Sequence, residues 1–144
     1  MMKLTQLSVF LENRPGHLSN VCGALSAAHL NIAALTMADT REFGILRLIL
    51  REWKQAREAL EAAGFVVNTT DVVALEVPDR PGGLESILKQ ADAVGLSVEY
   101  MYAFAIKQGE NARIVIRFDD MQRAVEVLES TGITFLRAAD FYKQ

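Results

Sequence analysis

A short loop that ends in glycine occurs twice in the sequence, and its residue types could bind a small ion. The loops Asn13-Arg14-Pro15-Gly16 and Asp79-Arg80-Pro81-Gly82 each precede a segment with helical spacing of apolar residues. The first turn of a helix offers free backbone N–H groups and a partial positive charge, which suit a carboxylate. Glycine lets a ligand come close to the backbone. Asn13 can donate or accept a hydrogen bond, and Asp79 can accept one from an ammonium group.

Two further polar residues, Asn31 and Ser97, are expected at the start of a strand that follows each helix. We expect them near the place where the helix meets the edge of the sheet. Together with the loops, they could hold the two charged ends of a free α-amino acid. The alternative is structural: Pro-Gly is a good turn in itself, and Asn13 or Asp79 caps it. The residues alone leave both interpretations open.

Residues for catalysis or metal binding are few. The chain has two histidines and one cysteine, and their spacing matches no metal-binding motif. His17 follows the first loop and is expected as an exposed residue of the first helical turn, and His29 is expected near the end of that helix, where a cation is favourable. Cys22 lies on an apolar stripe, which predicts an inert core thiol. We therefore expect no enzyme, no catalytic residue, no cofactor and no metal.

The loops belong to a longer internal repeat. With an offset of 66 residues, Arg14-Pro15-Gly16-x-Leu18 falls on Arg80-Pro81-Gly82-x-Leu84, and Asn31-Ile32 falls on Ser97-Val98. An insertion of two residues near 107–111 then moves the offset to 68, so that Gly64 falls on Gly132. Apolar positions and turn residues agree in order along both halves. We infer two copies of one module, residues 1–70 and 71–144.

Hydrophobic periodicity predicts the same elements, β-α-β-β-α-β, in each copy. Gly64 and Gly132 are expected to end the second helix of each copy. In the first copy we expect strands at Leu7–Leu11, Asn31–Met37, Leu46–Leu50 and Phe65–Val67, with helices at Leu18–Ala28 and Trp53–Ala63. In the second we expect strands at Val73–Val77, Ser97–Ala105, Ile114–Phe118 and Ile133–Leu136, with helices at Leu84–Val94 and Met121–Ser130.

This order predicts an α+β fold of two tandem ferredoxin-like βαββαβ modules, each an antiparallel sheet with both helices on one face. A linker is expected at about 68–72. In the second copy, alternation places Val98, Tyr100, Tyr102 and Phe104 on one face of the strand, and Met101, Ala103 and Ala105 on the other. A strand that is apolar on both sides needs cover on both sides. We therefore expect copy to pack on copy, chain on chain, or both.

Composition excludes several classes of protein. Of the 144 residues, 51% are hydrophobic, so the chain can fold, and a single cysteine cannot form a disulfide within it. No run of apolar residues is long enough to cross a bilayer, and the N-terminus does not resemble a signal peptide. The net charge of −3 and the absence of a basic stripe argue against nucleic acid. We expect a cytoplasmic protein with no membrane or nucleic-acid partner.

The repeated motif also resembles a known family. Asn13-Arg14-Pro15-Gly16-x-Leu18, an amphipathic helix and then Leu30-Asn31-Ile32-Ala33-Ala34 resemble the ACT domain, the regulatory module of amino-acid metabolism that binds small molecules. The second copy, with Asp79-Arg80-Pro81-Gly82-Gly83-Leu84 and Gly95-Leu96-Ser97-Val98, is similar. The resemblance covers nearly the entire chain, as two modules with no catalytic domain attached. It implies modules that associate side by side and bind amino acids at their interface.

The resemblance also implies which residues bind. In serine-binding members of the family, an Asn before the Arg-Pro-Gly loop and an Asn that opens the second strand contact the ligand, and these correspond to Asn13 and Asn31 here. Leu11 stands where those members have a histidine, which argues against serine and for a more apolar ligand. The predicted site comprises the loop residues and the residues that open the second strands: Asn13, Arg14, Pro15, Gly16, His17, Leu18, Asn31 and Ile32, with Asp79, Arg80, Pro81, Gly82, Gly83, Leu84, Ser97 and Val98 in the second copy.

Two functions follow as hypotheses. The first is a non-catalytic, allosteric regulatory protein that binds a free amino acid at module or subunit interfaces, assembles as a homo-oligomer such as a dimer, and contacts a regulated enzyme. The second is a structural or protein-interaction module that keeps the fold and binds no ligand. In the second case Tyr100, Tyr102 and Phe104 would serve only as an interface.

Overall fold

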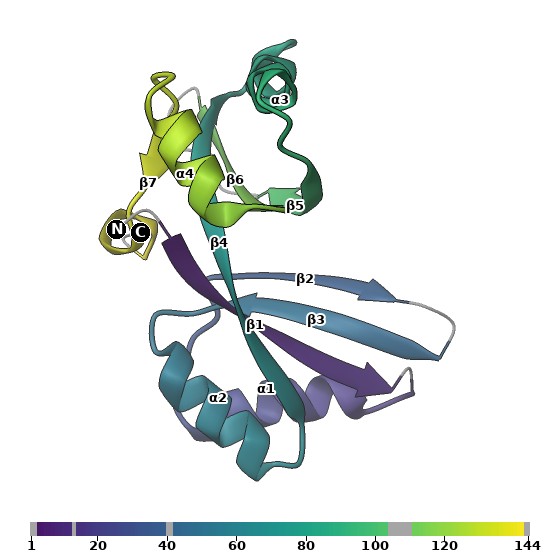
Figure 1. Ribbon diagram of the computed structural model, residues 1–144. Coiled ribbons are helices and arrows are strands. Elements are labelled where there is room, and N and C mark those ends of the chain that lie inside the picture. The colour runs from purple at the N-terminus through teal and green to yellow at the C-terminus, as the bar shows by residue number, and fades with distance from the viewer. Residues whose placement is uncertain (1–2, 13, 40–41, 104–110, 143–144) are drawn as a thin grey trace. The chain divides into compact units, whose positions relative to one another are not determined.

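The computed structural model describes residues 3–12, 14–39, 42–103 and 111–142. These residues form two compact units: Thr5–Thr70, and Asp71–Gln144 together with Met1–Leu4. Figure 1 shows their helices and strands. Each unit repeats the β-α-β-β-α-β order, so the predicted duplication of elements is confirmed.

The first unit contains a sheet of antiparallel neighbours. Its β3 pairs with both β1 and β2, and Leu48 lies opposite Leu7 on one side and Leu35 on the other. The elements of the first unit are β1 (Lys3–Glu12), α1 (His17–Ala27), β2 (Ala34–Asp39), β3 (Phe43–Ile49), α2 (Trp53–Ala62) and the start of β4 (Val66–Pro78). The alternation in β1 and β3 was read correctly from the sequence, because every second residue of these strands is buried on the helix side.

The core of the first unit lies between this sheet and its two helices. Val21 and Leu25 of α1, with Ala56 and Leu60 of α2, pack against the strand residues Leu7, Val9, Leu11, Leu46 and Leu48. Both helices therefore cover the same face of the sheet, as Figure 1 also shows. Burial of these side chains stabilises the unit by about 25 cal/mol for each Å² of apolar surface removed from water.

The second unit repeats this arrangement. Here β6 pairs with both β4 and β5, and the short β7 pairs with β4. Its elements are the end of β4, then α3 (Gly83–Ala93), β5 (Val98–Ala103), β6 (Asn111–Phe118), α4 (Met121–Glu129), β7 (Thr134–Leu136) and α5 (Ala138–Phe141). The sequence did not predict α5, a single helical turn that buries Phe141.

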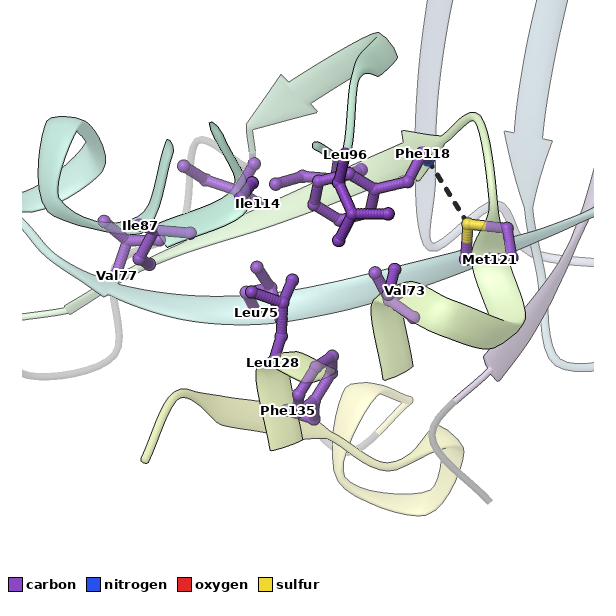
Figure 2. Packing of buried hydrophobic residues seen from close by; sticks show 13 residues of the cluster. Val73, Leu75, Val77, Ile87, Leu96, Ile114, Phe118, Met121, Leu128 and Phe135 are labelled. Carbon is purple, nitrogen blue, oxygen red and sulfur yellow. Dashed lines mark hydrogen bonds between the residues drawn. The ribbon is translucent and has the colours of Figure 1, made fainter. Parts of the chain in front are cut away.

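The core of the second unit is drawn in Figure 2. Ile87 of α3 and Leu128 of α4 pack with Leu75, Ile116 and Phe118 of the strands. The backbone N–H of Phe118 lies 3.2 Å from Sδ of Met121, and the Asp120 side chain accepts a hydrogen bond from the N–H of Arg123. These two contacts fix the point where β6 ends and α4 begins.

The expected linker at 68–72 is wrong, because these residues belong to a strand. β4 runs without interruption from Val66 to Pro78 and contributes residues to both units. The polar run Asn68-Thr69-Thr70-Asp71 resembled a loop, but threonine is well suited to a strand whose surface is partly exposed. The second strands also begin later than expected: β2 begins at Ala34 rather than Asn31, and β5 begins at Val98 rather than Ser97.

A β-bulge changes the faces predicted for β5. Val98 lies opposite Phe118 and Tyr100 lies opposite Arg117, so Glu99 is the extra residue on β5. As a result Val98 packs against the core of the second unit with Met101, and not on the face of Tyr100 and Tyr102. A bulge shifts the alternation by one residue, which a period of two cannot reveal. Phe104 and Ala105 lie outside the described residues.

Both units have the α+β architecture expected from the sequence: an antiparallel sheet with two helices on one face. The chain is a tandem pair of ferredoxin-like modules. The pairing of β4 with β6 and of β1 with β3 follows the split βαβ pattern in each unit. This architecture places each repeated loop directly before the first helix of its unit.

Candidate functional site

The first loop opens α1 with glycine in the left-handed region. Gly16 is the N-cap of α1 with φ 87°, and no described side chain caps the helix there. Arg14 is exposed, and its Nε lies 3.2 Å from Oε2 of Glu12. Pro15 is also exposed, and Asn13 lies outside the described residues. The N–H of His17, the first of α1, donates to the carbonyl oxygen of Arg14 over 3.3 Å, and the binding of a carboxylate at this helix start stays a prediction.

His17 is held in place on both sides of its ring. Its Nδ1 lies 2.8 Å from the backbone nitrogen of Glu12 and accepts a hydrogen bond from that N–H. Its ring also packs against Phe65, with 5.2 Å between the ring centroids and an angle of 34° between the planes. The side chain is half-buried, so His17 is not the exposed first-turn residue that the sequence predicted. Leu18, by contrast, is 41% exposed.

A cavity of about 590 Å³ lies beside the first half of α1, and we call it the helix-side hollow. It is lined by Arg14 and His17, by Asn20 and Gly23 on the flank of α1, and by Gly64 and Phe65 after α2. Its size is in the range of small-molecule sites. Of the predicted site residues that the structure describes, Arg14 and His17 line this hollow.

Asn31 and Ile32 lie at the other end of α1. They line a second cavity of about 450 Å³ together with Cys22, Ser26 and His29. The eleven residues of α1 stand between the loop and Asn31, and a helix of that length spans about 16 Å. Within one unit the structure does not bring Asn31 to the loop, so the grouping of these residues around one ligand stays a prediction that needs an interface between modules or subunits. A crossover helix connects the end of one strand to the start of the next, which places the two segments at opposite ends of the helix.

The second loop has the same backbone conformation at the helix start as the first loop, but the residue after its glycine is tightly packed. Gly82 is the N-cap of α3 with φ 84°, and Asp79, Arg80 and Pro81 are exposed. Gly83 is buried, and a Cβ added there would collide with the carbonyl oxygen of Pro78. Leu84 is half-buried against the core of the second unit. Close packing therefore accounts for Gly83 without any ligand.

Ser97 and Val98 also have structural roles in the second unit. The backbone N–H of Ser97 donates to Oδ1 of Asp119 over 3.1 Å, and its carbonyl accepts from the N–H of Asp119 over 3.0 Å. Val98 packs into the core. In the first copy the position that matches Asp119 is Arg51, which cannot accept such a bond. Asn31 is exposed, whereas Ser97 has its main chain tied to a carboxylate.

Cys22 is exposed on α1, which corrects the expectation of a core thiol. The apolar stripe of α1 is narrower than its sequence suggested and buries only Val21 and Leu25. Among the described residues, no three His, Cys, Asp or Glu side chains form a group that could hold a metal ion. Within the same residues, no helix is both long and apolar enough to span a membrane.

Seven of the described residues that line the helix-side hollow were not predicted as site residues, and Asn20, Gly23 and Phe65 are among them. A signal was present at Gly23, since an isolated glycine within a helical pattern often marks a packing or functional requirement. Phe65 was assigned only to a short strand, and nothing in its sequence context placed it beside His17. Contact between a loop and a residue about fifty positions later depends on tertiary structure.

Comparisons with known proteins agree with this architecture. The family model for the ACT domain pair matches residues 2–144. The crystal structure of protein BT0572 from Bacteroides thetaiotaomicron is similar, with a TM-score of 0.92 and 40% sequence identity over 99% of this chain and 98% of that one. None of the curated proteins compared with the chain matches it.

More distant structures share the fold alone. The regulatory subunit of aspartate kinase from Thermus thermophilus, in its ligand-free form, has a TM-score of 0.63 and 13% identity, over 90% of this chain and 93% of that one. The regulatory subunit from Thermus flavus has a TM-score of 0.62 and 16% identity, over 90% and 91%. The ACT domain pair that the family model describes is a regulatory type of module. This chain belongs to the ACT domain pair family.

Proposed function

We propose that this chain is a non-catalytic regulatory protein that binds a free amino acid at an interface between modules or between subunits. The observation that carries the proposal is the pair of helices, α1 and α3, that each begin at a left-handed glycine with no cap from a described side chain. The open N–H groups of such a helix can receive the carboxylate of an amino acid. Residues 1–70 and 71–144 are proposed as one ACT module each.

The first module is the better ligand module. Arg14, Pro15, Gly16 and Asn31 are exposed, whereas in the second module Gly83 is required by packing and the main chain of Ser97 is bonded to Asp119. We therefore assign the recognition residues Gly16, Leu18 and Asn31 to the ligand. For the second module, the observations favour the other hypothesis, a module that keeps the fold and binds nothing.

The length of α1 limits where one ligand could contact both the first loop and Asn31. The loop and Asn31 are separated by about 16 Å along the helix, which is longer than a free amino acid. A ligand that touches both must therefore lie between two modules, with the loop from one and Asn31 from the other. This supports a homo-oligomer, such as a dimer, whose assembly is coupled to binding.

The regulated partner is proposed to be an enzyme of amino-acid metabolism. Support comes from the family and from the shared fold of the aspartate kinase regulatory subunits. A cytoplasmic location is part of the same proposal.

Thermal shift and calorimetry against the twenty amino acids test the binding proposal. We expect one of them, or a small group with apolar side chains, to raise the melting temperature and to give a saturable heat. Asn31→Ala should weaken this binding at least tenfold. The matched variant Ser97→Ala in the second module should bind as the wild type does. The absence of any stabilising amino acid would refute the proposal, and equal loss in both variants would refute the assignment to the first module.

A further inference from the structure

The helix-side hollow has an aromatic floor. The Phe65 ring is half-buried after α2, and the His17 ring packs against it with 5.2 Å between centroids. Because Nδ1 of His17 is fixed by the N–H of Glu12, the pair is held in one arrangement. Aromatic rings in a fixed position favour a planar apolar group, through stacking or edge-to-face contact.

The rim of the hollow carries hydrogen-bond donors. Nδ1 of His17 lies 2.8 Å from the backbone nitrogen of Glu12 and 3.1 Å from its carbonyl oxygen, and Nε2 is a donor in the tautomer in which Nδ1 accepts from the N–H. Asn20 adds an exposed side-chain amide, and Arg14 adds a guanidinium with N–H groups beyond the Nε that faces Glu12. None of the described residues that line the hollow is acidic. These groups suit an anion, and a carboxylate matches both the amide and the guanidinium.

Gly23 has no packing reason to be glycine. It lies in the interior of α1, its φ is not in the left-handed region, and a Cβ added there would meet no atom within 4 Å. Glycine is the weakest helix former after proline, so its presence costs stability. The missing side chain keeps the hollow open at its centre.

The second unit has different residues at the matching positions. Lys89 stands where Gly23 does in the repeat, and its Nζ lies 3.8 Å from Oε2 of Glu85. His17 corresponds to the buried Gly83, and Phe65 corresponds to Ile133. The aromatic floor and the open helix flank are therefore features of the first unit only. Both units share the packing of sheet against helices, so that packing does not require the aromatic pair or the open helix flank.

We propose that the helix-side hollow binds a small aromatic monocarboxylate, with its ring against Phe65 and its carboxylate at the donors of His17, Asn20 and Arg14. This site lies along the flank of α1 and does not use Asn31. It shares Arg14 and His17 with the residues predicted for the amino-acid site, and it differs from that site in using Asn20, Gly23 and Phe65.

Titration of the full chain with phenylacetate tests the proposal, followed by NMR of ¹³C-labelled aromatic rings and by calorimetry. We expect saturable shifts of the Phe65 and His17 ring resonances. Phenylacetamide, which keeps the ring but has no charge, should bind at least tenfold more weakly. Absence of saturation at millimolar phenylacetate, or equal affinity for the amide, would overturn the proposal.

The variant Gly23→Met fills the hollow and should weaken phenylacetate binding at least tenfold. It is expected to fold at least as well as the wild type, because the added Cβ has free space and methionine favours helix. Lys89→Met places the same side chain at the matching, exposed position of α3 in the other unit and should change affinity less than twofold. If Gly23→Met binds phenylacetate as tightly as Lys89→Met does, the proposal is wrong. The amino-acid panel, repeated on Gly23→Met, reports separately on the other site.

Discussion

His29 adopts the backbone conformation that glycine adopts at the matching position of the second copy. Its φ is 58°, and that of Gly95 is 74°. The N–H groups of His29 and Leu30 bond to Ser26 and Leu25, and those of Gly95 and Leu96 bond to Asp92 and Ala91 in the same way. Both helices therefore end in the same left-handed motif, one with the preferred residue and one without it.

Exchange of these residues should change stability in opposite directions. We expect His29→Gly to raise the free energy of unfolding by about 1 kcal/mol, and Gly95→His to lower it by about the same amount, because only glycine adopts positive φ without steric cost. The melting temperature should change by about 2–4 °C for each kcal/mol in a chain of this size. Urea unfolding of both variants measures the effect. If His29→Gly instead lowers the free energy of unfolding, the imidazole makes a contact that stabilises the protein by more than the positive φ destabilises it.

At the scale of elements, the strands and helices that bury one face were predicted well from the sequence. The alternation of Leu46 and Leu48, and the helical spacing of Val21 and Leu25, directly express burial against one core. Features that depend on neighbouring strands were not predicted. The bulge at Glu99 and the passage of β4 through residues 68–72 depend on hydrogen bonding to partners far away in sequence.

The candidate site, too, could be predicted from the sequence only in part. Its glycine-capped loops follow from local turn chemistry, and the helices predicted from Leu18 and Leu84 begin one residue earlier, at His17 and Gly83. The separation of Asn31 from the loop, and the contact of His17 with Phe65, depend on the path of the chain in three dimensions. Residue type and spacing identify the groups in such a site, and topology decides which of them meet.

Proline substitutions test whether residues 68–72 are a strand in solution. Alternate residues of a strand point their N–H groups to opposite sides, so proline should cost about 3 kcal/mol at one of Thr69 and Thr70 and less at the other. Urea unfolding of Thr69→Pro and Thr70→Pro gives the two values. In a loop both substitutions would be tolerated, so two small costs would contradict the continuous strand.

At the scale of the whole molecule, the proposed ligand should couple binding to assembly. A ligand that binds only the folded, assembled state stabilises it by about 2.7 kcal/mol at a hundred times its Kd. If the ligand joins two chains, its effect on the melting temperature should increase with protein concentration.

Sedimentation velocity with and without the stabilising amino acid measures this coupling. We expect the amino acid to lower the dissociation constant of the oligomer in the wild type. Asn31→Ala should abolish that shift and leave assembly without ligand unchanged. Assembly that fails in Asn31→Ala without any ligand would assign Asn31 to the interface itself and not to the ligand.

The uninterrupted β4 has a consequence for the history and the engineering of this chain. A repeat joined by a loop can be cut, copied or transplanted at that loop, whereas a boundary that falls between Thr70 and Asp71 lies inside a single strand. Either half, if excised there, would lose part of a strand and gain a frayed end with unsatisfied backbone groups. The two modules should therefore be inherited together, and gene fusions should carry both copies or neither.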